Sequence, residues 1–258
     1  MLTSPIRGSG GTNQVSVPDY IARRVRTPYP DIPYVLRGST PVISFGDFRT
    51  ATVATLGLNP SDREFLKKGE WLTGPQQRLA SLRSLGLAAP EDASDAQVQE
   101  ITNACCRYFN GSNPYWRWFR PLDSLLQEGL SVSYEEGSAV HLDLVQWATA
   151  PVWGKIKEPH FRQQLILGDR EFLREQLARE NIQLVVMNGR SVIREAERMG
   201  MRIDDRTHLV GGHPKDEVVR GRLDDTTFFG WNYHIQNRGF SKEQRAQVLA
   251  QMKGLGRD

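Results

Sequence analysis

Chemistry in this chain would come from four short polar segments, each of which follows an apolar run. The segments are Gly57-Leu58-Asn59-Pro60-Ser61, residues 142–147 (Leu-Asp-Leu-Val-Gln-Trp), Met187-Asn188-Gly189-Arg190, and residues 230–239. They contain Asn, Asp and His side chains, which can orient water, accept hydrogen bonds and move a proton. The last segment gathers amide, phenol, imidazole and guanidinium groups directly before an expected helix, and helix N-termini bind phosphate.

Each segment alone has an ordinary explanation. Asn59-Pro60 and Asn188-Gly189 are dipeptides typical of turns. Asp143 is less ordinary, because it lies within an apolar stretch and a buried carboxylate needs a partner. The segments gain weight from occurring together, each at the end of an expected strand.

Alternating strands and helices are expected to position these segments. Continuous apolar runs predict buried strands at residues 53–58, 140–147, 182–187 and 226–231. Helical spacing and capping signals predict helices at residues 75–86, 96–108, 170–180 and 191–199, one starting at Asn113-Pro114 with a kink at Pro121, and a last helix capped by Ser241 and Gln244. This order is typical of a single three-layer α/β/α domain with a mostly parallel, four-stranded central sheet. Ligands of such folds bind at the carboxyl ends of the strands.

The composition fits a globular protein without a disulfide, cluster or membrane span. Hydrophobic residues make up 39% and charged residues 24% of the 258 residues, with no long apolar run and no secretory signal. The only cysteines, Cys105 and Cys106, are adjacent, which disfavours a mutual disulfide, and an iron–sulfur cluster typically takes four. We therefore expect a cytoplasmic protein. The net charge of +3 permits a nucleic-acid partner without identifying one.

Residues 1–30 are rich in Gly, Ser, Thr, Pro and Arg, and they predict a flexible basic arm ahead of a catalytic domain at residues 31–258. Arg23, Arg24 and Arg26 form a small basic cluster in this arm. The cluster is expected either to be solvated or to lie on phosphate.

Taken in order, the motifs resemble those of the uracil-DNA glycosylase superfamily over about residues 50–250. Gly57-Leu58-Asn59-Pro60-Ser61 is similar to the first motif of the mismatch-specific and single-strand-selective branches. Residues 113–119, 142–149 and 185–192 are similar to the Asn-x-Phe-Trp-Lys, Thr-Asn-Leu-Val-x-Arg-Thr and Val-x-x-x-Asn-Gly-Lys segments of the mismatch-specific branch. Residues 230–239 occupy the place of the motif that inserts a wedge into DNA, but they lack the His-Pro-Ser-Pro or Asn-Pro-Ser string of well-known members. The resemblance implies a uracil-DNA glycosylase-like fold and a monofunctional DNA glycosylase, which flips out a base and hydrolyses its N-glycosidic bond.

The resemblance also implies roles for individual residues. Asn59 is expected to position the attacking water and His234 to stabilise the leaving base, with His213, next to Pro214, as the alternative histidine. Ile235 is expected to be the wedge. Contacts to DNA are expected from Asn232, Ile235, Gln236, Asn237, Arg238 and Ser241. No metal or cofactor is expected, and the motifs contain no Lys that would suggest a lyase step.

Two positions bear on which base is removed. Ser61 stands where uracil-specific members carry a Tyr that blocks the 5-position, so a 5-substituent could fit. Asp143 stands where many members carry an Asn, and an ionised carboxylate accepts a hydrogen bond from the 4-amino group of cytosine but repels O4 of uracil. We therefore expect a 5-modified cytosine, removed in repair or in defence against phage. Phe65 and Trp71 are candidates for stacking on the base, with Tyr108 as a third.

Three alternatives remain open at this point. The first is a uracil or thymine mismatch DNA glycosylase, and the second is a non-catalytic DNA-binding protein of the same fold. The third is an enzyme that acts on free nucleosides, although residues 210–213 (Val-Gly-Gly-His) are too short for a glycine-rich phosphate loop. We expect a monomer that binds DNA and does not associate with membranes.

Overall fold

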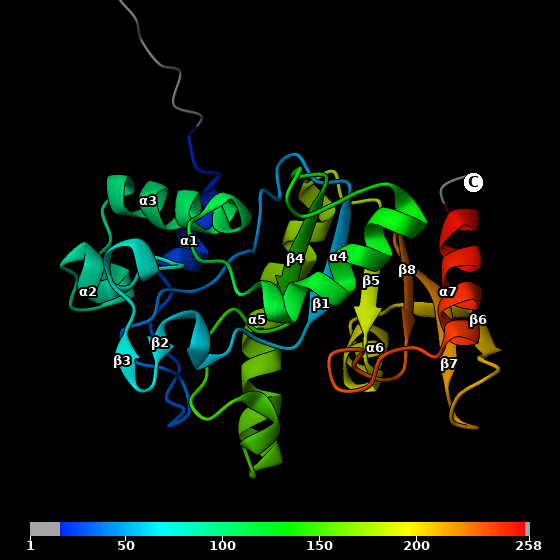
Figure 1. Ribbon diagram of the computed structural model, residues 1–258. Coiled ribbons are helices and arrows are strands. Elements are labelled where there is room, and N and C mark those ends of the chain that lie inside the picture. The colour runs from blue at the N-terminus through cyan, green and yellow to red at the C-terminus, as the bar shows by residue number, and fades with distance from the viewer. Residues whose placement is uncertain (1–15, 256–258) are drawn as a thin grey trace, which may run out of the picture.

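A six-stranded sheet forms the centre of the protein, in a computed structural model that describes residues 16–255 (Figure 1). The strand order is β4 (Ala139–Asp143), β1 (Val53–Gly57), β5 (Leu184–Asn188), β8 (Thr226–Trp231), β7 (Glu217–Leu223) and β6 (Arg202–His208). The first four strands are mutually parallel, and the last two are antiparallel additions. The predicted α/β class and its four parallel strands are confirmed, but the expectation of a four-stranded sheet is wrong.

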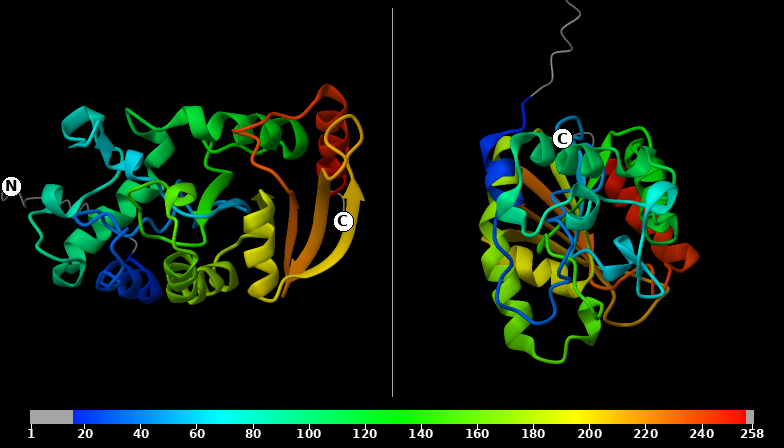
Figure 2. Two further views of the ribbon diagram at one scale, coloured as in Figure 1. Left: turned by 90° about the horizontal axis from the view of Figure 1, so that it is seen from below. Right: turned by 90° about the vertical axis from the view of Figure 1, so that its left-hand side faces the viewer.

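Helices cover both faces of this sheet (Figures 1 and 2). On one face lie α4 (Trp116–Leu130) and α7 (Lys242–Leu255), which contact each other. On the other lie α5 (Pro159–Arg179) and α6 (Arg190–Arg198). The remaining elements are α1 (Asp19–Val25), α2 (Leu82–Leu85), α3 (Asp95–Cys106) and a small hairpin of β2 (Leu66–Lys67) and β3 (Glu70–Trp71). This is the three-layer arrangement that alternating strands and helices predict.

The parallel strands are continuous apolar runs because both of their faces are covered. Every residue of β4 and β5 is buried, as are the first four residues of β1. The β6 strand is different, since it is charged along its length and six of its seven residues are exposed. Its sequence, Arg-Ile-Asp-Asp-Arg-Thr-His, lacks the apolar run by which the other strands are recognised, and charges of this kind protect a sheet edge from pairing with another chain.

Several helix boundaries differ from the expectation. The α5 helix begins at Pro159, eleven residues before the predicted start at residue 170. Only residues 82–85 of the predicted helix at 75–86 are α-helical. The last helix has the predicted capping box, in which the Ser241 hydroxyl accepts from the Gln244 amide and the Gln244 side chain accepts from the Ser241 amide, both at 3.1 Å. The α4 helix continues through Pro121.

The described part of the expected N-terminal arm is packed on the core. Tyr20, Ile21 and Val25 of α1 are buried, and Arg24 donates a 2.8 Å hydrogen bond to the buried Asp169 and a 3.1 Å hydrogen bond to Gln146. Residues 16–30 therefore do not form the flexible arm that their composition predicts, because the apolar face of α1 and this ion pair hold them. Residues 1–15 lie outside the described part of the chain.

Both cysteine thiols are free and buried, in agreement with the expected lack of a disulfide. Within residues 16–255, we find no helix with the length and apolar character needed to cross a membrane.

The buried ion pair gives a test of how α1 is attached. Arg24→Ala leaves Asp169 buried without its cation, so we expect the free energy of unfolding to fall by about 3–5 kcal/mol in denaturant titrations. Arg23→Ala is the matched control, because Arg23 is 64% exposed in its pair with Glu175 and should cost less than about 1 kcal/mol. Equal losses in the two variants would contradict a stabilising role for the buried pair.

Candidate functional site

A pocket of about 510 Å³ lies where the four parallel strands end. All four polar segments identified from the sequence contribute to its wall. Among the lining residues are Asn59 and Ser61 after β1, Asp143 at the end of β4, Asn188 at the end of β5, and His234 and Asn237 in the loop between β8 and α7. The predicted catalytic pair and both residues predicted to read the base are therefore in one cavity.

The Asn59 amide is held in one orientation. Its Nδ2 donates to the Thr149 hydroxyl at 2.9 Å and to the backbone carbonyls of Pro60 at 2.7 Å and Trp147 at 3.3 Å. Because these acceptors occupy the nitrogen, the carbonyl oxygen Oδ1 is left to accept from a molecule in the pocket. Thr149 is fully buried and its hydroxyl accepts from Asn59 Nδ2, so it helps to fix the orientation of the Asn59 amide. Its place after an apolar run gave no sign of this role.

A chain of polar groups runs beneath the pocket to Asp143. The Thr55 hydroxyl lies 2.6 Å from the Tyr134 hydroxyl and 2.7 Å from His141 Nδ1, and His141 Nε2 lies 3.4 Å from Asp143 Oδ1. Register explains the arrangement, because Thr55 pairs with His141 and Gly57 with Asp143 on the adjacent strands. A Cβ on Gly57 would lie 2.4 Å from Asp143 Oδ1 and 2.8 Å from His141 Nε2. The glycine therefore makes room for the buried His–Asp pair.

Glu64 is a second carboxyl in the pocket wall, and the sequence analysis did not identify it. It is only 4% exposed and accepts a 2.6 Å hydrogen bond from the Tyr108 hydroxyl. Burial raises its pKa to about 7, and the nearby Asp143 adds to the rise. The carboxyl is therefore partly protonated at neutral pH and can donate a hydrogen bond as well as accept one.

The His234 ring lines the pocket and packs directly against Gly189. A Cβ on Gly189 would lie 2.8 Å from the His234 ring, and the φ of Gly189 is 115°, a conformation that favours glycine. Burial lowers the pKa of His234, so the ring is neutral at neutral pH, and its buried Nδ1 has no hydrogen-bond partner within the described residues. His213, the alternative histidine, does not line this pocket and lies in the exposed turn before β7.

The expected stacking residues are not in the pocket. Phe65 is 2% exposed and packs against Trp71, whose ring covers Gly38, and neither side chain lines the cavity. Tyr108 is buried beneath it and is bonded to Glu64. Half-buried aromatic rings in the wall come instead from Tyr115, Trp118 and Trp153. The expectation of Phe65 or Trp71 as the stacking ring is wrong, because the short 3-10 turn after Ser61 directs Glu64 to the pocket and Phe65 to the core.

The loop between β8 and α7 is fastened to the sheet by Asn188. Asn188 Oδ1 accepts from Trp231 Nε1 at 3.0 Å and from the Ile235 amide at 3.2 Å, and its Nδ2 donates to Gln236 at 2.7 Å. Gln236 also donates to the Trp118 carbonyl, so both ends of its amide are bonded within the protein. Ile235 is 6% exposed in the core. The expected exposed wedge at Ile235 and the free amide at Gln236 are therefore not found.

Three other residues expected to contact DNA have structural partners. Asn232 bonds to the backbone of Lys215 and Glu217, Ser241 caps α7, and Arg238 pairs with Asp216 at 2.6 Å while stacking on Tyr233. Asn237 is exposed and lines the pocket. Of the expected DNA contacts, Asn237 and the half-exposed Arg238 are accessible in this structure.

A search of protein-family models finds no match to this chain, and a search of curated proteins finds no similar sequence. Within residues 16–255, no group of three His, Cys, Asp or Glu side chains is arranged to hold a metal ion.

The close packing around Gly57 can be tested by adding a methyl group at this position. Gly57→Ala places a methyl group against Asp143 and His141, and we expect a loss of about 1–3 kcal/mol of stability with a lower midpoint of thermal unfolding. Gly154→Ala is the matched control, because Gly154 also lines the pocket but a Cβ there meets nothing within 4 Å. An unchanged Gly57→Ala midpoint would show that the His–Asp pair is not tightly packed.

Proposed function

We propose that this protein is a monofunctional DNA glycosylase that removes a cytosine-type base, with a substituent at the 5-position, from DNA. The observation that carries the proposal is the meeting of Asn59, Asp143 and His234 in one pocket at the strand ends. A volume of about 510 Å³ lies in the range of pockets that bind small ligands, about 300–1,000 Å³, and leaves room for a substituent on a pyrimidine. Such a base reaches the pocket only after its nucleotide has flipped out of the duplex.

Asn59 directs the attacking water. Its Oδ1 accepts a hydrogen bond from the water, and Thr149 keeps Nδ2 turned away. The bond between C1′ of the sugar and the base nitrogen breaks, with its electron pair leaving on the base, and the water oxygen bonds to C1′ and releases a proton to solvent. The departing base anion takes up a proton from solvent. An amide is a poor base, so the reaction depends mainly on stabilising the anionic leaving group.

His234 is the group assigned to the leaving base. The neutral ring carries one N–H group, which donates a hydrogen bond to the developing anion. Its position over Gly189, within the loop that Asn188 anchors, holds the ring at the pocket wall.

Asp143 and Glu64 together fit the edge of a cytosine ring. A carboxyl oxygen of Asp143 accepts from the 4-amino group, and Glu64 in its protonated form donates to N3, which is an acceptor in cytosine. Uracil presents the opposite pattern at both atoms. Leaving a buried polar group unpaired costs about 1–3 kcal/mol, which is enough to decide between the two bases.

Base release from a panel of oligonucleotides tests the proposal. The panel carries cytosine, 5-hydroxymethylcytosine, glucosylated 5-hydroxymethylcytosine, uracil or a thymine mismatch, and we expect release of a 5-substituted cytosine. Release of uracil or thymine alone would establish the mismatch-glycosylase alternative. Release from free nucleosides but not from DNA would indicate a nucleoside hydrolase. Binding to DNA without release of any base would indicate a non-catalytic protein.

Asn59→Ala tests the water-positioning role. We expect single-turnover base release to fall by about 100-fold or more, with DNA affinity unchanged, because the side chain acts on the water and not on the DNA backbone. Asn181→Ala is the control, since Asn181 is exposed just before β5, at the opposite edge of the sheet. Full activity of Asn59→Ala would remove this mechanism.

Asp143→Asn tests how the base is read. An amide both donates and accepts, so the variant should lose about 10-fold or more in activity on the cytosine-type base and gain activity on uracil, measured as the ratio of kcat/KM values. An unchanged ratio, in a variant with the thermal stability of the wild type, would show that Asp143 does not read the base.

Glu64 predicts a pH dependence. As the pH rises through about 7 this carboxyl loses its proton and its ability to donate, so kcat/KM on the cytosine-type base should fall between pH 6 and 8.5. Glu64→Gln keeps an N–H donor at every pH and still accepts from Tyr108, so its alkaline limb should disappear. An identical limb in both proteins would assign the titration to another group.

A further inference from the structure

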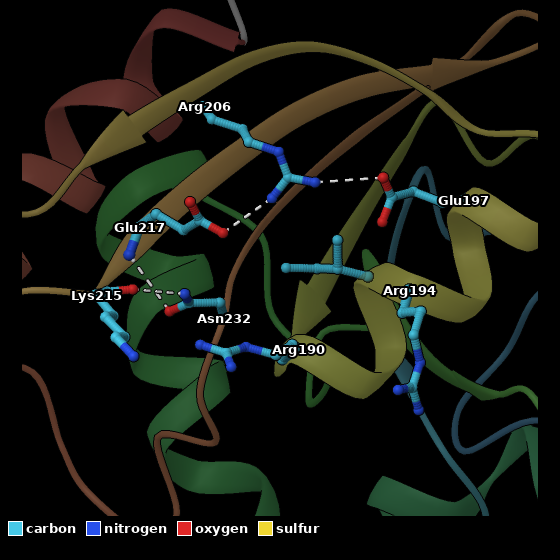
Figure 3. A pocket seen from close by; sticks show the side chains of 8 residues that line it. Arg190, Arg194, Glu197, Arg206, Lys215, Glu217 and Asn232 are labelled. Carbon is cyan, nitrogen blue, oxygen red and sulfur yellow. Dashed lines mark hydrogen bonds and ion pairs between the residues drawn. The ribbon is translucent and has the colours of Figure 1, made fainter.

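A second hollow, of about 440 Å³, opens at the same edge of the sheet as the main pocket (Figure 3). It lies between α6 and the adjoining ends of β6, β7 and β8. Its charged and polar lining consists of Arg190, Arg194, Arg206, Lys215, Glu197, Glu217 and Asn232. We call it the basic pocket. Of its charged residues, Arg190 alone belongs to one of the four polar segments singled out from the sequence, and no role was predicted for it.

The two acidic residues of the basic pocket share one cation, Arg206. Arg206 lies 3.2 Å from Glu197 and 2.9 Å from Glu217, and Figure 3 shows its guanidinium spanning the two carboxylates. Arg190 and Lys215 are exposed and have no ion-pair partner within residues 16–255. The hollow therefore keeps an excess of positive charge on the side of these two residues.

Arg190 and Lys215 are held on well-anchored backbone. Asn232 donates to the Lys215 carbonyl at 2.7 Å and accepts from the Glu217 amide at 3.3 Å, which ties the start of β7 to the end of β8. Arg190 is the first residue of α6, whose N-terminus has no side-chain cap. In Figure 3 the Arg190 side chain extends toward Asn232 and Lys215, so the two cations converge near the positive end of a helix dipole.

A smaller hollow of about 240 Å³ shares lining residues with both the basic pocket and the main pocket. It shares Arg194 with the basic pocket and shares Ser191 and Arg162 with the main pocket, and Arg198 also lines it. Arg162 lies on α5, and Arg194 and Arg198 lie on α6, where they pair with the buried Glu195 at 3.6 Å and 2.7 Å. Three cations and one carboxylate therefore line this hollow. A series of cations beside a concave site fits a ligand with repeated negative charges, such as a nucleic-acid backbone.

We propose that the basic pocket binds a backbone phosphate of the DNA strand on one side of the flipped nucleotide, with Arg190 and Lys215 as its ligands. This inference rests on the proposed function, because it assigns the path of the DNA relative to the main pocket. Contacts of this kind fix the register of the protein on DNA and carry no sequence information.

The test compares the salt dependence of DNA binding in two double variants. R190Q/K215Q removes both ligands, and R222Q/K253Q removes the same charge from the far end of β7 and from the last turn of α7. Fluorescence anisotropy with a labelled duplex that lacks a target base measures affinity from 50 to 200 mM salt. For R190Q/K215Q we expect at least a 10-fold loss of affinity at low salt and a slope of log K against log salt that is smaller by about 2. For R222Q/K253Q we expect the wild-type slope.

The outcomes separate this proposal from the proposed function. A slope equal to that of the wild type overturns the basic-pocket proposal, whether or not the protein releases a base. A reduced slope in a protein that releases no base supports the phosphate contact and overturns only the glycosylase.

A free phosphate ion has the same chemistry as a backbone phosphate, and experiments with inorganic phosphate distinguish the two ligands. If millimolar phosphate raises the unfolding midpoint of the wild type but not of R190Q/K215Q, while the two bind DNA equally, the basic pocket is a site for a free phosphate and the DNA contact is overturned. If phosphate competes with the labelled duplex in the wild type and not in the double variant, the contact is supported.

Discussion

The geometry of the pocket depends on the hydrogen bonds of one buried side chain, Asn188. It lies at the end of β5, in the interior of the sheet, and it is 4% exposed. Three bonds from one amide fix Trp231, Ile235 and Gln236, and thereby the whole turn that carries His234. The turn has no regular structure of its own, so its position relative to Asn59 and Asp143 comes from this amide and from the packing of Ile235. A buried amide with every group bonded specifies one arrangement, since each broken bond would leave a polar group unpaired.

Two glycines provide the space that this arrangement needs. Gly57 admits the His141–Asp143 pair, and Gly189 admits the His234 ring. The strand ends of a parallel sheet meet at one edge, but side chains there would ordinarily fill the gap between neighbouring strands. In this protein the missing side chains on β1 and after β5 are replaced by functional side chains from β4 and from the β8–α7 loop. The pocket is thus a consequence of register as much as of residue type.

The sequence predicts where the parallel strands lie, because their buried residues are mostly apolar, although β4 ends at Asp143 and not at the predicted residue 147. The prediction misses β6 and β7, because β6 is charged and mostly exposed and the two strands pair through backbone hydrogen bonds, which leave no pattern in the sequence.

The gathering of strand-end residues in one pocket follows from topology and could be predicted. Two pocket residues, Glu64 and His141, were not predicted. Glu64 lies in a polar stretch typical of a surface turn, and its burial is set by Tyr108 from a distant segment. His141 did offer a signal, since it lies two residues before Asp143 and therefore on the same face of a strand.

The burial of Ile235 changes how base flipping must be driven in a glycosylase of this design. Unstacking a base costs a few kcal/mol, and a wedge from the β8–α7 loop was the expected compensation. With that side chain in the core, the compensation must come from contacts to the backbone and to the extruded base. The half-buried rings of Tyr115, Trp118 and Trp153 offer stacking surface inside the pocket, and the cations along α5 and α6 offer phosphate contacts outside it. Both act on the extruded strand and not on the gap in the duplex. A base that is already weakly paired, or a strand that is already single, would then be the substrate with the lowest cost, because a glycosylase of this design would hold the flipped nucleotide and would do little to fill the space that it leaves.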